Sequence, residues 1–238
     1  MLKLVKSHEF AIHSLLNSIK SRFNHTVSIL DEVAVGVEKI IVMPEEKVLP
    51  DVADSVFKTG GDDLARQFLH GVQFMHEQRV AHLDLKPENI LVTATSSPRL
   101  LIIDFDVSVR VPEEDSWIEG YRGTEGWTAP ELDGSNPRYQ PIRADLWSVG
   151  RILRYFAGRQ RASTNCRFKP LADALLRCNP LERPLLSETH LRRHLGNQEA
   201  VSQSLKRKHD VDAWETEATK RKCVNNVLSR GARGILHQ

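Results

Sequence analysis

The sequence predicts an α+β fold with a small N-terminal part that contains a sheet and a larger, mainly helical C-terminal part. In the first 44 residues, one helical pattern of apolar residues lies between segments that alternate or run as short apolar strands. Beyond residue 45 the long apolar patterns follow the helical period. No segment is repeated. We therefore expect a partial sheet lobe over 1–44, a helical lobe over 45–195 and a charged, flexible tail over 196–238.

The N-terminal part is expected to contain a strand, a helix and two further strands. Residues 1–7 alternate apolar and basic side chains, which indicates a strand. Apolar residues at helical spacing predict a helix from His8 to about Ser21. Short apolar runs predict strands over 27–30 and 39–43, and Pro44 ends the second.

The C-terminal part begins with a linker over 45–61, with room for one short helix, because it contains Pro50, Gly60 and Gly61. Asp62 or Asp63 is then expected to cap a helix that ends near Gln78. The remaining predicted elements are a β-pair over 90–92 and 100–103, a loop over 104–138, and helices over 144–156, 171–178 and 187–195.

Composition limits the function classes. The net charge of +2 gives no overall attraction to nucleic acid or membranes. The three cysteines form no C-x-x-C pair, which argues against a zinc site and a disulfide framework and suits a reducing compartment. The N-terminus lacks the apolar core of a signal peptide, and no apolar run is long enough to span a bilayer. We expect a soluble cytoplasmic or nuclear protein with no membrane partner.

One short stretch, Ala-His-Leu-Asp-Leu-Lys-Pro-Glu-Asn-Ile-Leu over 81–91, carries the strongest chemical signal. It combines a proton acceptor, Asp84, with a cation, Lys86, and an amide oxygen, Asn89. Phosphoryl transfer depends on such a mixture, because its catalysis consists of positioning and charge neutralisation.

Asp104 follows a buried apolar strand, within Ile-Asp-Phe-Asp over 103–106. A carboxylate there is costly without a metal or a charged partner, although a plain turn aspartate is the commoner case. With Asn89 it forms an oxygen pair suited to Mg²⁺.

Three further motifs follow in order. They are the segment from Tyr121 to Glu131 that ends in Ala-Pro-Glu, D-L-W-S-V-G from Asp145, and N-P-L-E-R-P from Asn179. Each alone could be an ordinary helix start or cap. In this order, over roughly residues 1–195, they resemble eukaryotic-type serine/threonine protein kinases, in the style of kinase-like proteins common in fungi.

The resemblance implies roles for these residues. Asp84 orients the substrate hydroxyl, Lys86 lies beside the transferred phosphate, and Thr124 contacts the catalytic aspartate. Asn89 and Asp104 are implied as the Mg²⁺ ligands.

It also implies an ATP site and a structural frame. The backbone of Pro44 to Glu46 would bond the adenine edge, and Leu91 would form the floor under adenine. Glu131 and Arg183 would form a structural ion pair, and Asp145 would hold the backbone of the catalytic loop.

The sequence departs from the family pattern in several places. No Gly-rich phosphate loop precedes Glu9, so we expect an N-terminally incomplete kinase. Lys3 either pairs with Glu9 near the ATP phosphates or is a solvated strand lysine. Leu83 replaces an arginine that pairs with phosphorylated activation loops. Asp106 replaces a glycine, and from this change we expect reduced but not abolished activity.

The tail carries two basic clusters, at 206–208 and 220–222, separated by eleven residues. They resemble a bipartite signal for a nuclear import receptor, although ordinary basic clusters on a solvated helix or disordered tail are the commoner case. Acidic residues between the clusters argue against nucleic-acid binding.

The leading hypothesis is therefore an ATP- and Mg²⁺-dependent kinase of serine and threonine in protein substrates. The alternative is a pseudokinase that acts as a binding scaffold, because the Gly-rich loop is missing and Asp106 is present. A kinase of small molecules is a third option, which the segment with Thr124 disfavours.

Overall fold

The structure is a computed structural model that describes residues 1–134, 137–160 and 167–187. Contacts divide the chain into residues 1–194 and 195–238, and all the described residues belong to the first unit. The expected helix over 187–195, apart from Ser187, and the charged tail with its basic clusters lie outside the described residues.

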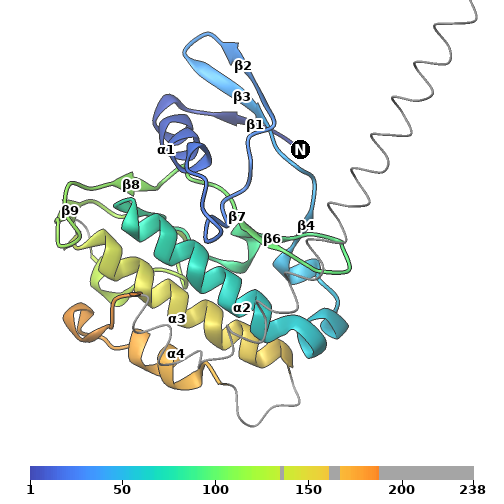
Figure 1. Cartoon of the computed structure of the whole chain (residues 1–238). Coiled ribbons are helices and arrows are strands. Elements are labelled where there is room, and N and C mark those ends of the chain that lie inside the picture. The colour runs from blue at the N-terminus through green and yellow to red at the C-terminus, as the bar shows by residue number, and fades with distance from the viewer. Residues whose placement is uncertain (135–136, 161–166, 188–238) are drawn as a thin grey trace, which may run out of the picture. The chain divides into compact units, whose positions relative to one another are not determined.

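A three-stranded antiparallel sheet forms the N-terminal part. Its order is β1–β3–β2, with β1 at Leu2–Val5, β2 at Asp31–Val35 and β3 at Glu38–Val42. Helix α1 (Ser7–Ser18) begins two residues after β1 and lies beside this sheet (Figure 1). Its buried side chains include Glu9. Because the connection is so short, the first turn of α1, which contains Glu9, stays close to β1.

The strand predicted over 27–30 is wrong. The chain there runs alongside β7 instead, since Thr26 bridges Ile102 and the Val27 N–H donates to the Ile102 carbonyl at 3.0 Å. The strand next to β3 is β2, and all five residues of β2 are exposed. Gly36 makes the turn with a φ of 61°. Because β2 is exposed and begins with two acids, its sequence does not show the apolar alternation that would predict a strand.

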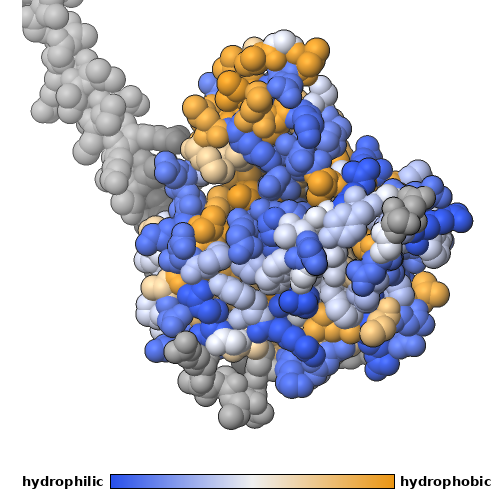
Figure 2. Space-filling view, turned by 180° about the vertical axis from the view of Figure 1, so that it is seen from behind, coloured by the Kyte–Doolittle hydropathy of each residue, from blue (hydrophilic) through white to orange (hydrophobic). Residues whose placement is uncertain are grey.

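The outer face of this sheet is apolar. Figure 2 shows hydrophobic side chains gathered over it. Exposed apolar side chains from the sheet and the residues beside it include Leu2, Leu4, Val33, Val35 and Val37.

The C-terminal part is built on three helices, α2 (Asp54–Glu77), α3 (Pro141–Gln160) and α4 (Lys169–Leu175). A second sheet has the order β4–β6–β7, with β4 at Lys47–Val48, β6 at Ile90–Val92 and β7 at Leu100–Ile102. Two-stranded ribbons pair β5 (Val80–Ala81) with β8 (Val109–Arg110) and β9 (Ile118–Glu119) with β10 (Arg138–Tyr139). The 3₁₀ turns are Leu49–Asp51, Pro87–Asn89, Pro130–Leu132 and Pro180–Glu182.

These elements confirm the predicted β-pair and the helices over 144–156 and 171–178, with shifted ends. Among the described residues, no helix has the length and apolarity needed to cross a membrane.

The predicted start of α2 is wrong, because the helix begins at Asp54 and runs through both glycines of the expected linker. Glycine in a helix costs about 1 kcal/mol relative to alanine. Packing offsets that cost here. Phe57 is buried with its ring centroid 5.8 Å from that of Phe156, and a Cβ on Gly61 would lie only 2.5 Å from Gln160 Nε2. The Gln160 amide is the end of a flexible side chain that can move aside, so the packing of Phe57 against α3 accounts for the helical conformation here.

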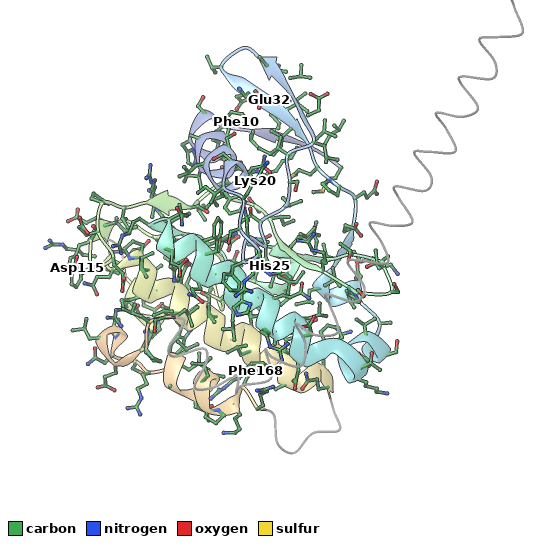
Figure 3. The ribbon with its side chains drawn as sticks, viewed as in Figure 1. Phe10, Lys20, His25, Glu32, Asp115 and Phe168 are labelled. Carbon is green, nitrogen blue, oxygen red and sulfur yellow. The ribbon has the colours of Figure 1, made fainter. Side chains whose placement is uncertain are left out.

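His25 lies between α2 and β7 (Figure 3), where its Nδ1 bonds the Leu100 carbonyl at 3.1 Å and its Cβ faces Gly71. Burial lowers the pKa of His25 to about 4, below its ordinary value of 6.5. Since the folded state resists protonation, the contribution of His25 to stability is complete above about pH 6.5 and decreases as the pH falls towards 4. We expect this loss to reach about 3 kcal/mol.

The measurement is the free energy of unfolding in urea between pH 4 and pH 7, for the wild type and His25→Asn. Asparagine keeps an N–H donor near Leu100 but does not titrate, so the variant should lose less stability on acidification. An equal loss in both proteins would show that His25 is not the group responsible.

Candidate active site

Four predicted site residues meet around the Asp84 carboxylate. The Thr124 hydroxyl donates to Asp84 Oδ1 at 2.6 Å, and Lys86 Nζ lies 2.9 Å from Oδ2. Lys86 Nζ also donates to Thr124 Oγ1 at 2.7 Å. Asn89 Nδ2 donates to both the backbone oxygen and Oδ2 of Asp84, each at 2.9 Å. The carboxylate is thereby held in one orientation by three different side chains.

The loop that carries Asp84 is held in place by Asp145 on α3. The Asp145 carboxylate accepts hydrogen bonds from the backbone N–H groups of His82 and Leu83, both at 2.7 Å, and contacts His76 Nε2 at 3.0 Å. Leu83 adopts a φ of 65°, an unfavourable value for a side chain with a Cβ. The hydrogen bonds that the His82 and Leu83 N–H groups donate to this fully buried carboxylate offset that strain.

Gly123 brings the segment with Thr124 against this loop. Its φ is 103°, and a Cβ at this position would lie 2.3 Å from the Leu83 carbonyl oxygen. Only glycine allows this approach, which places the Thr124 hydroxyl within reach of Asp84.

A second cluster forms around Lys3 on β1. Its ammonium donates to Asp104 Oδ1 at 2.8 Å and pairs with the buried carboxylate of Glu9 on α1. Of the two alternatives left open for Lys3, the paired one is therefore present in the structure. The turn between β1 and α1 explains how a glutamate only six residues away can reach it.

The pKa values in this cluster follow from burial and pairing. Burial opposes the charge on Lys3, but hydrogen bonds to Asp104 and Glu9 outweigh it and raise the lysine pKa. Burial opposes the charge on Asp104 too, and the bond from Lys3 overcomes it and lowers the pKa of that carboxyl. For Glu9, burial exceeds the effect of Lys3 and raises the pKa. One positive charge is thus shared by two carboxyl groups, so the cluster can attract a further cation.

Backbone bonds join the two clusters. The Ile103 N–H donates to the Asn89 carbonyl at 3.1 Å, and His82 Nε2 lies 2.9 Å from the Ile103 carbonyl oxygen. The Phe105 ring packs between His13 of α1 and His82, with centroid separations of 5.0 and 5.3 Å. Asn89 and Asp104 are therefore presented on neighbouring segments.

The donor set fits a hard divalent cation. Asn89 uses its amide N–H₂ for Asp84, and no hydrogen bond to its Oδ1 is formed within the described residues. Asp104 uses Oδ1 for Lys3 and leaves Oδ2 without such a partner among the same residues. Carboxylate and amide oxygens are ligands that Mg²⁺ accepts. The two residues could hold the ion implied by the sequence motifs.

The backbone conformation at residue 106 does not require the glycine that the family pattern has there. Its φ lies outside the left-handed region, and its half-exposed carboxylate pairs with Lys6 Nζ at 3.1 Å. Its backbone oxygen contacts the His8 ring. The second carboxylate is therefore engaged at the N-terminus of α1.

Glu46 and Leu91, the predicted adenine-site residues, form no hydrogen bond with either cluster. The Glu46 carboxylate accepts the Ala94 N–H at 3.2 Å and lines a separate cavity of about 310 Å³ beside the end of α1. Leu91 is buried on β6, where it pairs with Val48 and Leu101.

The predicted structural ion pair is present. Arg183 is fully buried and donates from Nη1 and Nη2 to the two carboxylate oxygens of Glu131, at 2.6 and 2.7 Å. Its other donors bond the backbone oxygens of Arg177, Cys178 and Arg143. This pair anchors the end of the segment that carries Thr124.

The comparison with known families decides what this arrangement is. The protein kinase domain matches residues 15–194, which hold the Asp84 and Asp104 motifs and the Glu131–Arg183 pair. The chain belongs to the protein kinase family. The predicted family and the kinase-like α+β fold are thus confirmed.

Several relatives are serine/threonine kinases by name. Serine/threonine-protein kinase ULK3 of Rattus norvegicus is 29% identical over 170 residues, covering 71% of this chain and 34% of that protein. Serine/threonine-protein kinase ULK3 of Xenopus laevis is 31% identical over 138 residues, covering 58% and 27%. Serine/threonine-protein kinase 17A of Oryctolagus cuniculus is 41% identical over 95 residues, covering 39% and 22%. The chain spans about a third or less of these relatives.

Some contacts of this kinase domain were not predicted. Arg79 on the turn after α2 pairs with Glu114 at 3.3 Å, which fastens the segment before Thr124. Leu83, in the place of the family arginine, is instead buried among apolar side chains that include Val111 and Tyr139. The acidic run at 113–115 was the one signal in the sequence for this contact, and nothing in it identified Arg79 as the partner.

Proposed function

We propose that this protein kinase domain transfers the γ-phosphoryl group of ATP, with Mg²⁺, to serine or threonine hydroxyls of protein substrates. The observation that carries the proposal is the bonded group of Asp84, Lys86 and Thr124, joined through Asn89 to the Lys3–Asp104 pair. It supplies an oriented proton acceptor, cations and free metal-ligating oxygens within one bonded unit. Phosphoryl transfer needs these parts.

Each side chain has a distinct role in this proposal. Asp84 orients the substrate hydroxyl and accepts its proton, while Lys86 offsets charge that develops nearby. Asn89 and Asp104 would hold Mg²⁺, which neutralises phosphate charge when bound. Lys3, kept charged by its two carboxyl partners, provides a further cation for the nucleotide phosphates.

A binding scaffold without transfer activity is the second candidate, and Asp106 favours it. Its carboxylate lies two residues from Asp104 and, although Lys6 pairs with it, adds negative charge beside the proposed metal site that the glycine of the family pattern lacks. The two functions differ in whether bound nucleotide is turned over.

The first test is nucleotide binding measured by thermal unfolding. ATP with Mg²⁺ at a hundred times its Kd should stabilise the full chain by about 2.7 kcal/mol, seen as a rise in Tm. Asp104→Ala should remove the Mg²⁺-dependent part of that rise, because one of two oxygen ligands is lost. Asp62→Ala, an exposed acid on α2, is the matched control and should keep the full rise.

A wild-type protein without a Tm rise from ATP and Mg²⁺ would contradict the proposal. A rise accompanied by no transfer of radiolabelled phosphate to generic protein substrates would favour the scaffold.

A further inference from the structure

The cavity of about 310 Å³ beside the end of α1 is lined by three segments that are distant in the sequence. They are the end of α1 with the chain that follows it to residue 28, the segment 44–46, and the β6–β7 hairpin between residues 93 and 101. The volume is at the lower end of the range for small-molecule pockets. None of Asp84, Lys86, Asn89, Asp104 and Thr124 lines the cavity, so it is distinct from the proposed phosphoryl-transfer site.

Two cations line this cavity. Lys20 follows the end of α1 (Figure 3), and Arg99 immediately precedes β7. Both side chains are exposed, and neither the Lys20 ammonium nor the Arg99 guanidinium makes a hydrogen bond or ion pair within the described residues. A single unpaired cation on a surface is ordinary. Here two of them, from segments far apart in the chain, converge on one concave site.

The uncharged side chains of the lining add further hydrogen-bond donors. Asn17 uses its side-chain oxygen for the Ile29 N–H at 3.2 Å, so its amide N–H₂ has no partner in the described part of the chain. The Ser28 hydroxyl has none there either. Ser21 Oγ accepts the Phe23 N–H at 3.1 Å, which leaves its own proton to donate. Such donors suit a ligand that is rich in acceptor oxygens.

The groups that would repel an anion are largely engaged. The carbonyl oxygens at the end of α1 carry the partial negative charge of the helix dipole. Asn24 Nδ2 donates to two of the carbonyl groups there, those of Leu16 at 2.8 Å and Ile19 at 3.1 Å. The carboxylate of the lining, Glu46, accepts the Ala94 N–H at 3.2 Å. Two cations therefore face one carboxylate that already has a donor.

We propose that this cavity is a second binding site, which takes a phosphate group between Lys20 and Arg99 with Asn17 and Ser28 as further donors. A phosphate group presents several acceptor oxygens to donors on different segments, and its hydrogen bonds to lysine and arginine are charge-assisted. Inorganic phosphate and a phosphoserine side chain offer this same chemistry. A bound phosphate would link the end of α1 to the β6–β7 hairpin, and Glu46 limits its affinity.

The experiment is isothermal titration calorimetry on the full chain. The probes are inorganic phosphate, a phosphoserine blocked at both ends, and the same blocked serine without phosphate, which should not bind. Lys20→Gln with Arg99→Gln should raise the Kd for phosphate about tenfold, since an exposed ion pair contributes up to about fivefold. Glu46→Gln should lower the Kd, because it removes a like charge from the lining. Lys58→Gln removes an exposed cation on α2 that does not line the cavity, and it should leave the Kd unchanged.

The two phosphate probes separate the sources of the ligand. Tighter binding of the blocked phosphoserine would identify a phosphorylated side chain, and binding no tighter than that of inorganic phosphate would identify the free anion. Either result supports the site when the double variant weakens it.

Three results would overturn the assignment. They are the absence of binding by both phosphate probes, an equal loss in Lys58→Gln, and a Kd that the double variant leaves unchanged, which would place the phosphate elsewhere on the protein. Circular dichroism verifies that each variant is folded. If the double variant does not fold, Glu46→Gln decides the question alone, because only a phosphate in this cavity would be held more tightly once that carboxylate is neutralised.

Discussion

Asp84→Asn is expected to lower phosphoryl transfer to a peptide substrate by about 10²- to 10⁴-fold, the usual contribution of a general base. Asparagine has the size of aspartate but has no negative charge and cannot accept a proton. Thr124 and Lys86 would then have an amide in place of the carboxylate that they now share. The measurement is the steady-state rate with radiolabelled ATP.

The loss should be confined to the chemical step. Asn89 bonds the backbone oxygen of Asp84 as well as its side chain, and Asp145 holds the loop, so the fold should persist. The Tm rise with ATP and Mg²⁺ should therefore remain. Asp115→Asn is the matched control, since Asp115 is exposed on the segment between β8 and β9 (Figure 3) and forms no bond with Asp84, Lys86 or Thr124. A variant at Asp84 with more than about a tenth of wild-type activity would exclude the assigned role.

Local spacing explains why part of this site could be predicted. Asp84, Lys86 and Asn89 lie within six residues, and Pro87 begins a short 3₁₀ turn that folds Asn89 back onto Asp84. The short buried strands β6 and β7 could be predicted for a related reason, because their apolar residues are continuous in sequence. In both cases the structure depends on residues that are neighbours along the chain.

Contacts between distant segments could be predicted only through the family resemblance. Lys3 and Asp104 are separated by 101 positions, and nothing in either neighbourhood specifies the other. The choice between a paired and a solvated Lys3 depends on where β1 ends and α1 begins. That turn places Glu9 beneath Lys3, and its position is set by packing of α1 on the sheet.

The errors have one physical cause, which is that tertiary contacts override local preference. Gly60 and Gly61 indicate a linker, yet α2 continues through them because side chains before and after the pair, Phe57 and Leu64, are buried. Val27 has the residue type of a strand, yet it is buried beside β7, and the exposed β2 pairs with β3 instead. Such choices depend on surfaces that form only after the elements pack.

The largest loss of stability is expected from Glu131→Ala, at about 3–5 kcal/mol. The variant would leave the Arg183 guanidinium fully buried without its carboxylate partner, while the backbone oxygens around it neutralise no charge. A cation in a protein interior is costly unless it is paired. The measurement is the free energy of unfolding in urea at neutral pH.

Removing both charges tests whether the unpaired cation is the cause. Glu131→Leu with Arg183→Met should recover part of the loss, because no buried charge remains and the apolar side chains fill part of the same space. Glu182→Ala, which breaks the exposed pair with Arg177, is the matched control and should change stability little. A double variant at least as unstable as Glu131→Ala would show that the hydrogen bonds of Arg183 to Arg177, Cys178 and Arg143, and not its charge, dominate. Among the described residues, Glu131 is what joins the segment with Thr124 to Arg183, so Glu131→Ala is also expected to reduce transfer at temperatures where the domain stays folded.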